Sequence, residues 1–173
     1  ESDNTILVWY NDEVPGGGLG ELHWWNDRVF YEIFVRSFYD SDGDGIGDLV
    51  GLTQQLDYLN DGDPATTSDL GVDGLWLMPI MPSPSYHGYD VTDYLRVNEE
   101  YGTNEDFKRL ISEAHARGIR VIIDLVLNHT SSRHPWFRDA WRLRSPYHDW
   151  YIWSYETRDY LGPWSQPVWH ELR

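Results

Sequence analysis

Residues 103–126, TNEDFKRLISEAHARGIRVIIDLV, predict a helix that is followed directly by a strand. Thr103 and Asp106 have the spacing of a capping box, and apolar residues line one face of the helix that follows: Phe107, Leu110, Ile111 and Ala114. The apolar run 119–126 then has the length and the β-branched content of a buried strand. It contains a single acid, Asp124, and a carboxylate in such a run needs hydrogen-bond partners.

The same alternation of strand and helix stands earlier in the chain. Residues 29–35, VFYEIFV, run apolar on both faces, as in a strand covered on both sides, and residues 72–77, VDGLWL, predict a second buried strand. Between them four leucines recur at helical spacing: Leu49, Leu52, Leu56 and Leu59. Strands that alternate with helices pair in parallel through crossovers, which predicts an α/β fold, either a doubly wound sheet or the start of a (β/α)8 barrel.

Outside these units the periodicity stops. Residues 11–20 include three consecutive glycines and predict a flexible lead-in. Residues 130–173 hold six of the ten Trp residues, several turn signals and no clear helical period, which predicts a loop-rich insertion after the third strand. Ordinary packing of a small core is the alternative role for its aromatic rings.

Composition and charge exclude several functions. Acids outnumber bases by 29 to 13, which argues against nucleic-acid binding, and no stretch approaches the roughly 18 apolar residues of a membrane span. The absence of Cys excludes disulfides and thiolate chemistry. The polar start, Glu1-Ser-Asp-Asn4, is not a signal peptide, so a mature secreted form and a cytoplasmic form both fit.

Acids alternate with small residues in the stretch 40–48, DSDGDGIGD. Counted from Asp40, carboxylates fall at positions 1, 3, 5 and 9, as in a loop that wraps a cation with oxygen ligands. This pattern predicts a structural Ca2+ site with five ligands, of which the fourth offers its carbonyl: Asp40, Asp42, Asp44, Ile46 and Asp48. Gly51 stands where an EF-hand has its bidentate Glu, so the loop is not an EF-hand. A solvated acidic turn is the alternative.

Two further clusters follow the second and third predicted strands. Tyr86, His87 and Tyr89 offer aromatic planes and hydrogen-bond donors that suit a sugar, although plain packing is also compatible with them. The third strand ends in residues 124–129, DLVLNH, whose His129 can reach a ligand or serve a structural role. In a (β/α)8 barrel both clusters would lie at the active-site end.

Taken together, these segments resemble the α-amylase family of glycoside hydrolases, closely along residues 28–135. Four stretches carry the resemblance, namely the first strand, the calcium loop of the oligo-1,6-glucosidase and neopullulanase branches, the second strand and the first signature region: 28–38, 40–49, 71–79 and 124–129. The resemblance implies the N-terminal part of a (β/α)8 barrel. Its parts would be a lead-in, three β/α units and the beginning of an inserted domain B: residues 1–27, 28–129 and 130–173.

The resemblance also implies roles for individual residues. Tyr89 matches the tyrosine that stacks under the sugar in subsite −1, His129 matches the histidine that hydrogen-bonds the same sugar, and His87 looks like a second polar wall. Asp124 and Asn128 match residues that organise the site from below. In many family members that asparagine also binds a calcium ion.

The implied activity is retaining hydrolysis of internal α-1,4-glucosidic bonds in starch-like α-glucans by a secreted enzyme. The sequence at Tyr86 favours an amylase, since α-glucosidases usually carry an acid there. The family's catalytic carboxylates follow strands four, five and seven, and no acid of this chain matches them, Asp90 and Asp93 included. We therefore expect the chain alone to be inactive and to associate non-covalently with the remaining C-terminal portion. The alternatives are an exo-acting α-glucosidase or neopullulanase-like enzyme, a non-catalytic carbohydrate-binding homologue and a free-standing calcium-binding fold.

Overall fold

The computed structural model describes residues 23–154, 156, 159–162, 165 and 167–169. The lead-in predicted for residues 11–20 lies outside the described residues. The chain forms two compact units, Glu1–His134 and Pro135–Arg173. This boundary falls shortly after the one that the sequence placed between residues 129 and 130.

The first unit is built on a three-stranded parallel sheet in the order β1-β2-β3. Its strands are β1 (Phe30–Ile33), β2 (Gly74–Leu77) and β3 (Arg120–Ile123), so all three predicted strands are confirmed, each shorter than predicted. The first strand ends early because the chain turns into the short helix α1 (Val35–Phe38), where the Ser37 amide donates to the Phe34 carbonyl oxygen at 3.0 Å.

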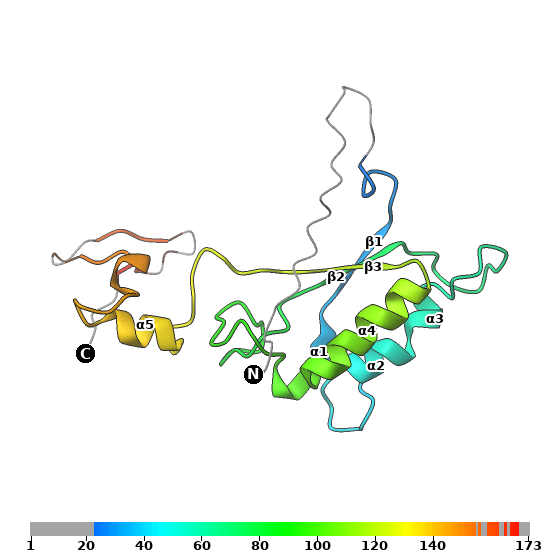
Figure 1. Ribbon diagram of the computed structural model, residues 1–173, viewed down its shortest axis with the longest axis horizontal. Helices are drawn as coiled ribbons and strands as arrows, with labels where there is room; N and C mark the ends of the chain where they lie inside the picture. Colours follow the sequence, from blue (N-terminus) through cyan, green and yellow to red (C-terminus); the bar gives the residue numbers. More distant parts are fainter. Residues whose placement is uncertain (1–22, 155, 157–158, 163–164, 166, 170–173) are drawn as a thin grey trace. The chain divides into compact units, whose positions relative to one another are not determined.

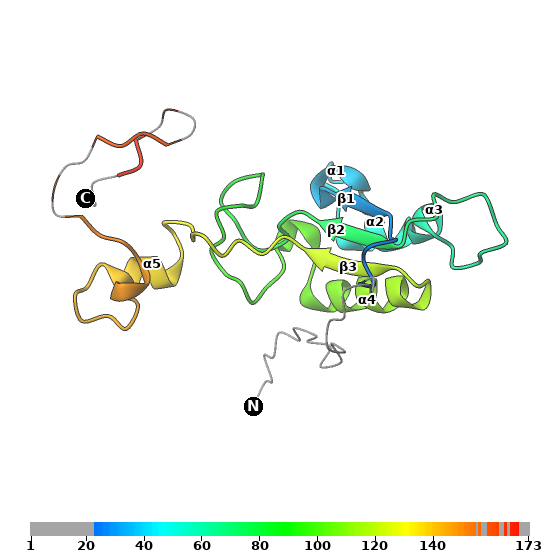
Figure 2. The ribbon, with the colours of Figure 1, turned by 90° about the horizontal axis from the view of Figure 1, so that it is seen from above.

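The helical segment of four leucines is present but divided. It forms α2 (Leu49–Gln54) and α3 (Leu56–Leu59), with Gln55 between them, and the side chains of all four leucines are fully buried. The second predicted helix is α4 (Asn104–Ala116), which begins at the predicted capping box. A 3-10 helix, η1 (Glu99–Tyr101), precedes it. Figures 1 and 2 show α2 and α4 together on one side of the sheet.

The two faces of the sheet differ in burial. Leu75 and Leu77 of β2 point toward the helices and are fully buried, whereas Trp76 between them is 39% exposed. Glu32 and Ile122 are in register with Trp76 and are also exposed. Within the described residues helices cover one face of the first strand, and Glu32 lies on the other face. The prediction that this strand is covered on both sides stays a prediction.

The second unit contains the short helix α5 (Pro135–Ala140) and the 3-10 helix η2 (His148–Trp150). Its aromatic rings pack against one another: Phe137 lies 5.0 Å from Tyr151 and His148 stacks on Trp153 at 5.3 Å, measured between ring centroids. The sequence missed α5 because six residues are too few to show a helical period.

Candidate functional site

The candidate groups gather at one edge of the sheet. In a parallel sheet all carboxyl ends of the strands lie at the same edge, and the segments after β2 and β3 leave from it. Tyr89 stands in the loop after β2, and Asp124 directly follows β3. The loop 40–48 follows β1 and α1.

The Asp124 carboxylate joins two of these segments. Its Oδ1 accepts a hydrogen bond from the indole Nε1–H of Trp76 at 2.7 Å, and its Oδ2 accepts one from the Tyr89 hydroxyl at 2.5 Å. The Asp124 amide donates to the Leu77 carbonyl oxygen at 2.8 Å, which extends the pairing of β2 with β3 by one step. The carboxylate thus has the partners that its place in an apolar strand demands, and Trp76 is one that the sequence did not single out.

Tyr89 is held as a neutral phenol. The hydrogen bond to Asp124, followed by burial, raises the pKa of Tyr89 to about 12. The charge of Asp124 and that of Glu32 act in the same direction. A phenol with the ordinary pKa is already uncharged near neutral pH, so the bond to Asp124 fixes the position of the Tyr89 hydroxyl rather than its charge there.

His87 packs beside this ring and presents a donor. The two rings are stacked with centroids 6.1 Å apart, and Nδ1 of His87 lies 3.1 Å from the Tyr89 amide nitrogen. Because a backbone N–H only donates, Nδ1 is the acceptor, and the proton of the neutral imidazole is on Nε2. Tyr86 meets His87 edge-on and is 71% exposed, so His87 contacts the rings of both tyrosines.

Asp90 holds the same loop together. Its Oδ1 accepts from the hydroxyl of Ser83 at 2.5 Å and also from that of Ser85. Burial acts to raise the pKa of Asp90, but these hydroxyls outweigh it and the pKa lies below its ordinary value. Asp90 is therefore an ionised residue of the loop's own structure.

His129 is bonded within the chain through both ring nitrogens. Nε2 lies 3.0 Å from the Tyr89 carbonyl oxygen, which can only accept, so Nε2 donates. Nδ1 then accepts from the Asn128 side-chain amide at 3.2 Å. The structure brings His129, Asn128 and Tyr89 together, and a bond from Nε2 of His129 to a sugar would have to replace the one to Tyr89. The sugar-binding role of His129 stays a prediction.

Tyr94 is a further residue that the sequence did not reveal. Its hydroxyl oxygen lies 2.7 Å from the Val126 carbonyl oxygen and 3.0 Å from that of His129. It therefore ties the loop after β2 to the segment after β3 and fixes the backbone beside the histidine.

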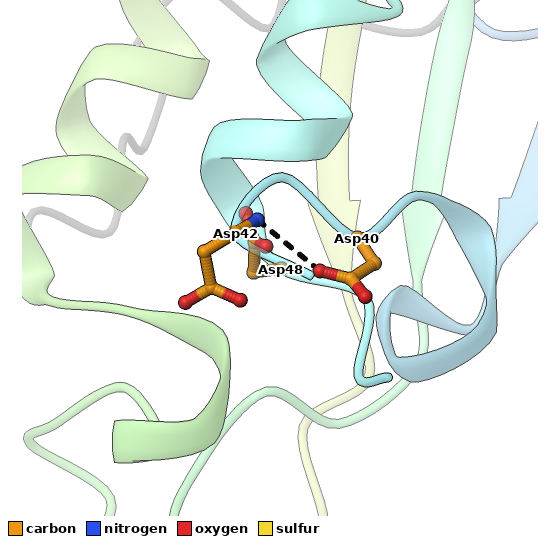
Figure 3. Close-up of side chains that lie close together, drawn as sticks. All are labelled: Asp40, Asp42 and Asp48. Atoms are coloured by element: carbon orange, nitrogen blue, oxygen red, sulfur yellow. Dashed lines mark hydrogen bonds between the residues drawn. The ribbon is translucent and has the colours of Figure 1, made fainter. Parts of the chain in front are cut away.

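Three of the predicted metal ligands come together in the acidic loop. Asp40, Asp42 and Asp48 each offer a carboxylate oxygen, and these three atoms lie within 4.8 Å of one another (Figure 3). Ca2+ binds oxygen at about 2.3–2.6 Å, so the oxygens around one ion lie up to about 5 Å apart. The separation of the three carboxylates fits such an ion.

The backbone of the loop supports these anions. The Asp40 carboxylate accepts from the amides of Gly45 at 2.8 Å and Gly43 at 2.7 Å, and these bonds lower its pKa. Asp44 lies outside the group of three and instead accepts from the Ile46 amide at 2.7 Å. Asp48 also caps α2 by accepting from the Gly51 amide at 2.7 Å.

The fold and the site define the class of protein. Parallel strands joined by helices, with polar groups collected where the strands end, are typical of (β/α)8-barrel enzymes. The family model described as alpha amylase, catalytic domain, matches residues 32–170. The chain therefore belongs to the α-amylase family, and its sheet is the first part of the barrel.

Individual relatives agree with this assignment. The chain is 57% identical to alpha-amylase 3 of Dictyoglomus thermophilum over 77% of its length and 48% identical to an oligo-1,6-glucosidase of Heyndrickxia coagulans over 81%. It spans only 25% and 24% of those two proteins. A crystal structure of an alpha-amylase from H. orenii matches with a TM-score of 0.79 and 60% identity over 83% of this chain and 30% of that one.

Among the described helices, none has the length and apolar character needed to cross a membrane.

Proposed function

We propose that this chain supplies part of sugar subsite −1 to an enzyme that hydrolyses internal α-1,4-glucosidic bonds in starch-like α-glucans. The observation that carries the proposal is the position of the Tyr89 ring, whose hydroxyl is fixed by its hydrogen bond to Asp124 at the carboxyl edge of the sheet. A sugar ring stacks on such a plane through its apolar face. The Nε2 donor of His87, beside it, suits a sugar hydroxyl.

Whether the enzyme attacks internal bonds or chain ends is a separate part of the proposal. A tyrosine at position 86, where α-glucosidases usually carry an acid, and the identity of 57% with an alpha-amylase favour an endo-acting enzyme. The identity of 48% with an oligo-1,6-glucosidase supports the alternative, an exo-acting enzyme of the α-glucosidase or neopullulanase kind.

The acids of the loop after β2 are not proposed as the bond-breaking groups. Retaining hydrolysis needs a nucleophilic carboxylate and a carboxylic acid about 5 Å apart. Asp90 is held ionised by two serine hydroxyls, and Asp93 binds the Leu95 amide at 2.9 Å and Arg96 at 2.8 Å. These acids serve the loop, so we propose that other residues of the complete enzyme supply the catalytic carboxylates.

The loop 40–48 is proposed to bind a structural Ca2+. Asp40, Asp42 and Asp48 would hold the ion, with Asp44 and the carbonyl of Ile46 as further candidates that need a small change of the loop. The ion would neutralise mutual repulsion among the carboxylates and fix the loop against the start of α2. From the family resemblance we also propose that the enzyme is secreted.

The early products from soluble starch test the proposed activity. The complete protein is incubated with starch, and the first products are separated by chromatography. Mixed oligosaccharides are the expected result. Glucose alone would favour the exo-acting enzyme, and no product at all would favour a non-catalytic carbohydrate-binding homologue.

A further inference from the structure

The Trp76 side chain lies on the face of the sheet opposite the helices and reaches the candidate site from there. Its neighbours Leu75 and Leu77 point to the helices, and strand alternation turns the indole to the other side. Asp124 follows β3 on that side, two residues after Ile122, which is paired with Trp76. The indole N–H meets Oδ1 of Asp124 at 2.7 Å.

This contact determines how the carboxylate is turned. The terminal torsion of an aspartate side chain is broad, so a carboxylate held by one partner can rotate. Asp124 has a donor on each oxygen, Trp76 on Oδ1 and the Tyr89 hydroxyl on Oδ2. An indole N–H can only donate and does not ionise near neutral pH, so it is a constant anchor for one oxygen.

We propose that Trp76 is a positioning residue that orients the Tyr89 ring for the sugar through the Asp124 carboxylate. With the indole N–H bound to Oδ1, Oδ2 faces the phenol and fixes the plane of its ring. Without that donor the carboxylate turns, and the ring loses its fixed orientation. The inference rests on the proposed function of Tyr89 and extends the site to a residue of the strand itself.

Maltotriose binding to four variants of the complete protein tests the inference. They are Trp76→Phe, Tyr89→Phe, the double variant and a control, Trp24→Phe, whose ring contacts Phe30 and Arg120 at the opposite end of the strands. Calorimetry should show affinity about tenfold weaker for each site variant, the effect of losing one hydrogen bond to a charged group. The double variant should also lose only about tenfold, since both changes act through one carboxylate.

A second measurement separates positioning from a general loss of structure. The indole N–H resonance of Trp76, identified by its absence in Trp76→Phe, should shift in Asp124→Asn, while the Trp24 resonance should not. This holds even if Trp76→Phe fails to fold in useful amounts, because the resonance can then be assigned by standard triple-resonance methods.

The outcomes separate a failure of the proposed function of Tyr89 from a failure of the inference about Trp76. If the unchanged protein does not bind maltotriose, the proposed function fails and the inference fails with it. If the unchanged protein binds and Trp76→Phe binds as well as Trp24→Phe does, only the inference is overturned. A loss of about a hundredfold in the double variant, or an unmoved Trp76 resonance in Asp124→Asn, would also overturn it.

Discussion

At the residue scale, hydrogen-bond demand explains the candidate site. An acid in the apolar run after residue 119 had to find partners, and this much follows from the sequence alone. Which partners it finds does not, because Trp76 and Tyr89 are 48 and 35 residues away and meet Asp124 only through the pairing of β2 with β3. The bond from His129 to the Tyr89 carbonyl oxygen, 40 residues away, is unpredictable from sequence for the same reason.

The ionisation of Tyr89 gives the first prediction. Its pKa is raised to about 12 in the folded protein, against an ordinary value of 10.0. A raised pKa means that the neutral phenol stabilises the fold fully below pH 10, and this contribution is lost as the pH rises toward 12. The tyrosinate absorbance of the parent minus that of Tyr89→Phe should therefore rise well above pH 10. A difference curve centred near pH 10 would show that the bond to Asp124 is not formed.

At the element scale, the acidic loop and α2 share a residue. Asp48 caps the helix through the Gly51 amide and also belongs to the group of three carboxylates. The spacing of the acids predicted the metal loop. It did not predict that Asp48 also caps α2, because that role depends on the helix beginning at Leu49. Removal of Asp48 would thus disturb two functions, so Asp42 is the better residue for a test.

Calcium should stabilise the parent protein more than the Asp42→Asn variant. The amide keeps the Oδ1 that accepts from the Asp44 amide at 3.1 Å but removes one negative charge from the group of three. Calcium at ~100 times its dissociation constant should add about 2.7 kcal/mol to the free energy of unfolding of the parent. Urea unfolding with calcium and with a chelator measures the difference. Equal stability of the parent in both conditions would contradict the calcium proposal.

The cap of α4 gives a prediction independent of metal. The Thr103 hydroxyl and amide both bind the Asp106 carboxylate, at 2.6 and 2.8 Å, and the Asp106 amide returns a bond at 3.2 Å. Thr103→Ala should cost about 1 kcal/mol in the free energy of unfolding. Lys108→Ala is the matched control, since its exposed pair with Glu105 is worth about 0.3–0.5 kcal/mol. Urea denaturation should rank the two variants in that order, and the reverse order would contradict the role of the cap.

At the scale of the whole molecule, the sequence predicted the order of elements but not their surroundings. The strand and helix patterns are local, so β1, β2, β3 and α4 were found where expected. The face that carries Glu32, Trp76 and Ile122 lies opposite the helices, and in a (β/α)8 barrel this face points to the barrel interior. The boundary after His134 depends on packing rather than on composition.

Asp90 and Asp93 are proposed not to break the glycosidic bond, because both are engaged in their own loop. In the complete protein, Asp93→Asn should therefore retain hydrolysis of soluble starch, measured as the release of reducing ends. Loss of all hydrolysis in a folded Asp93→Asn variant would contradict this assignment.

A crystal structure of the complete protein with maltotriose tests the central claim most directly. A glucose ring should be stacked on Tyr89, with the phenol still bonded to Asp124 and Nε2 of His87 donating to a sugar hydroxyl. Maltotriose bound only at a site remote from Tyr89 would contradict it.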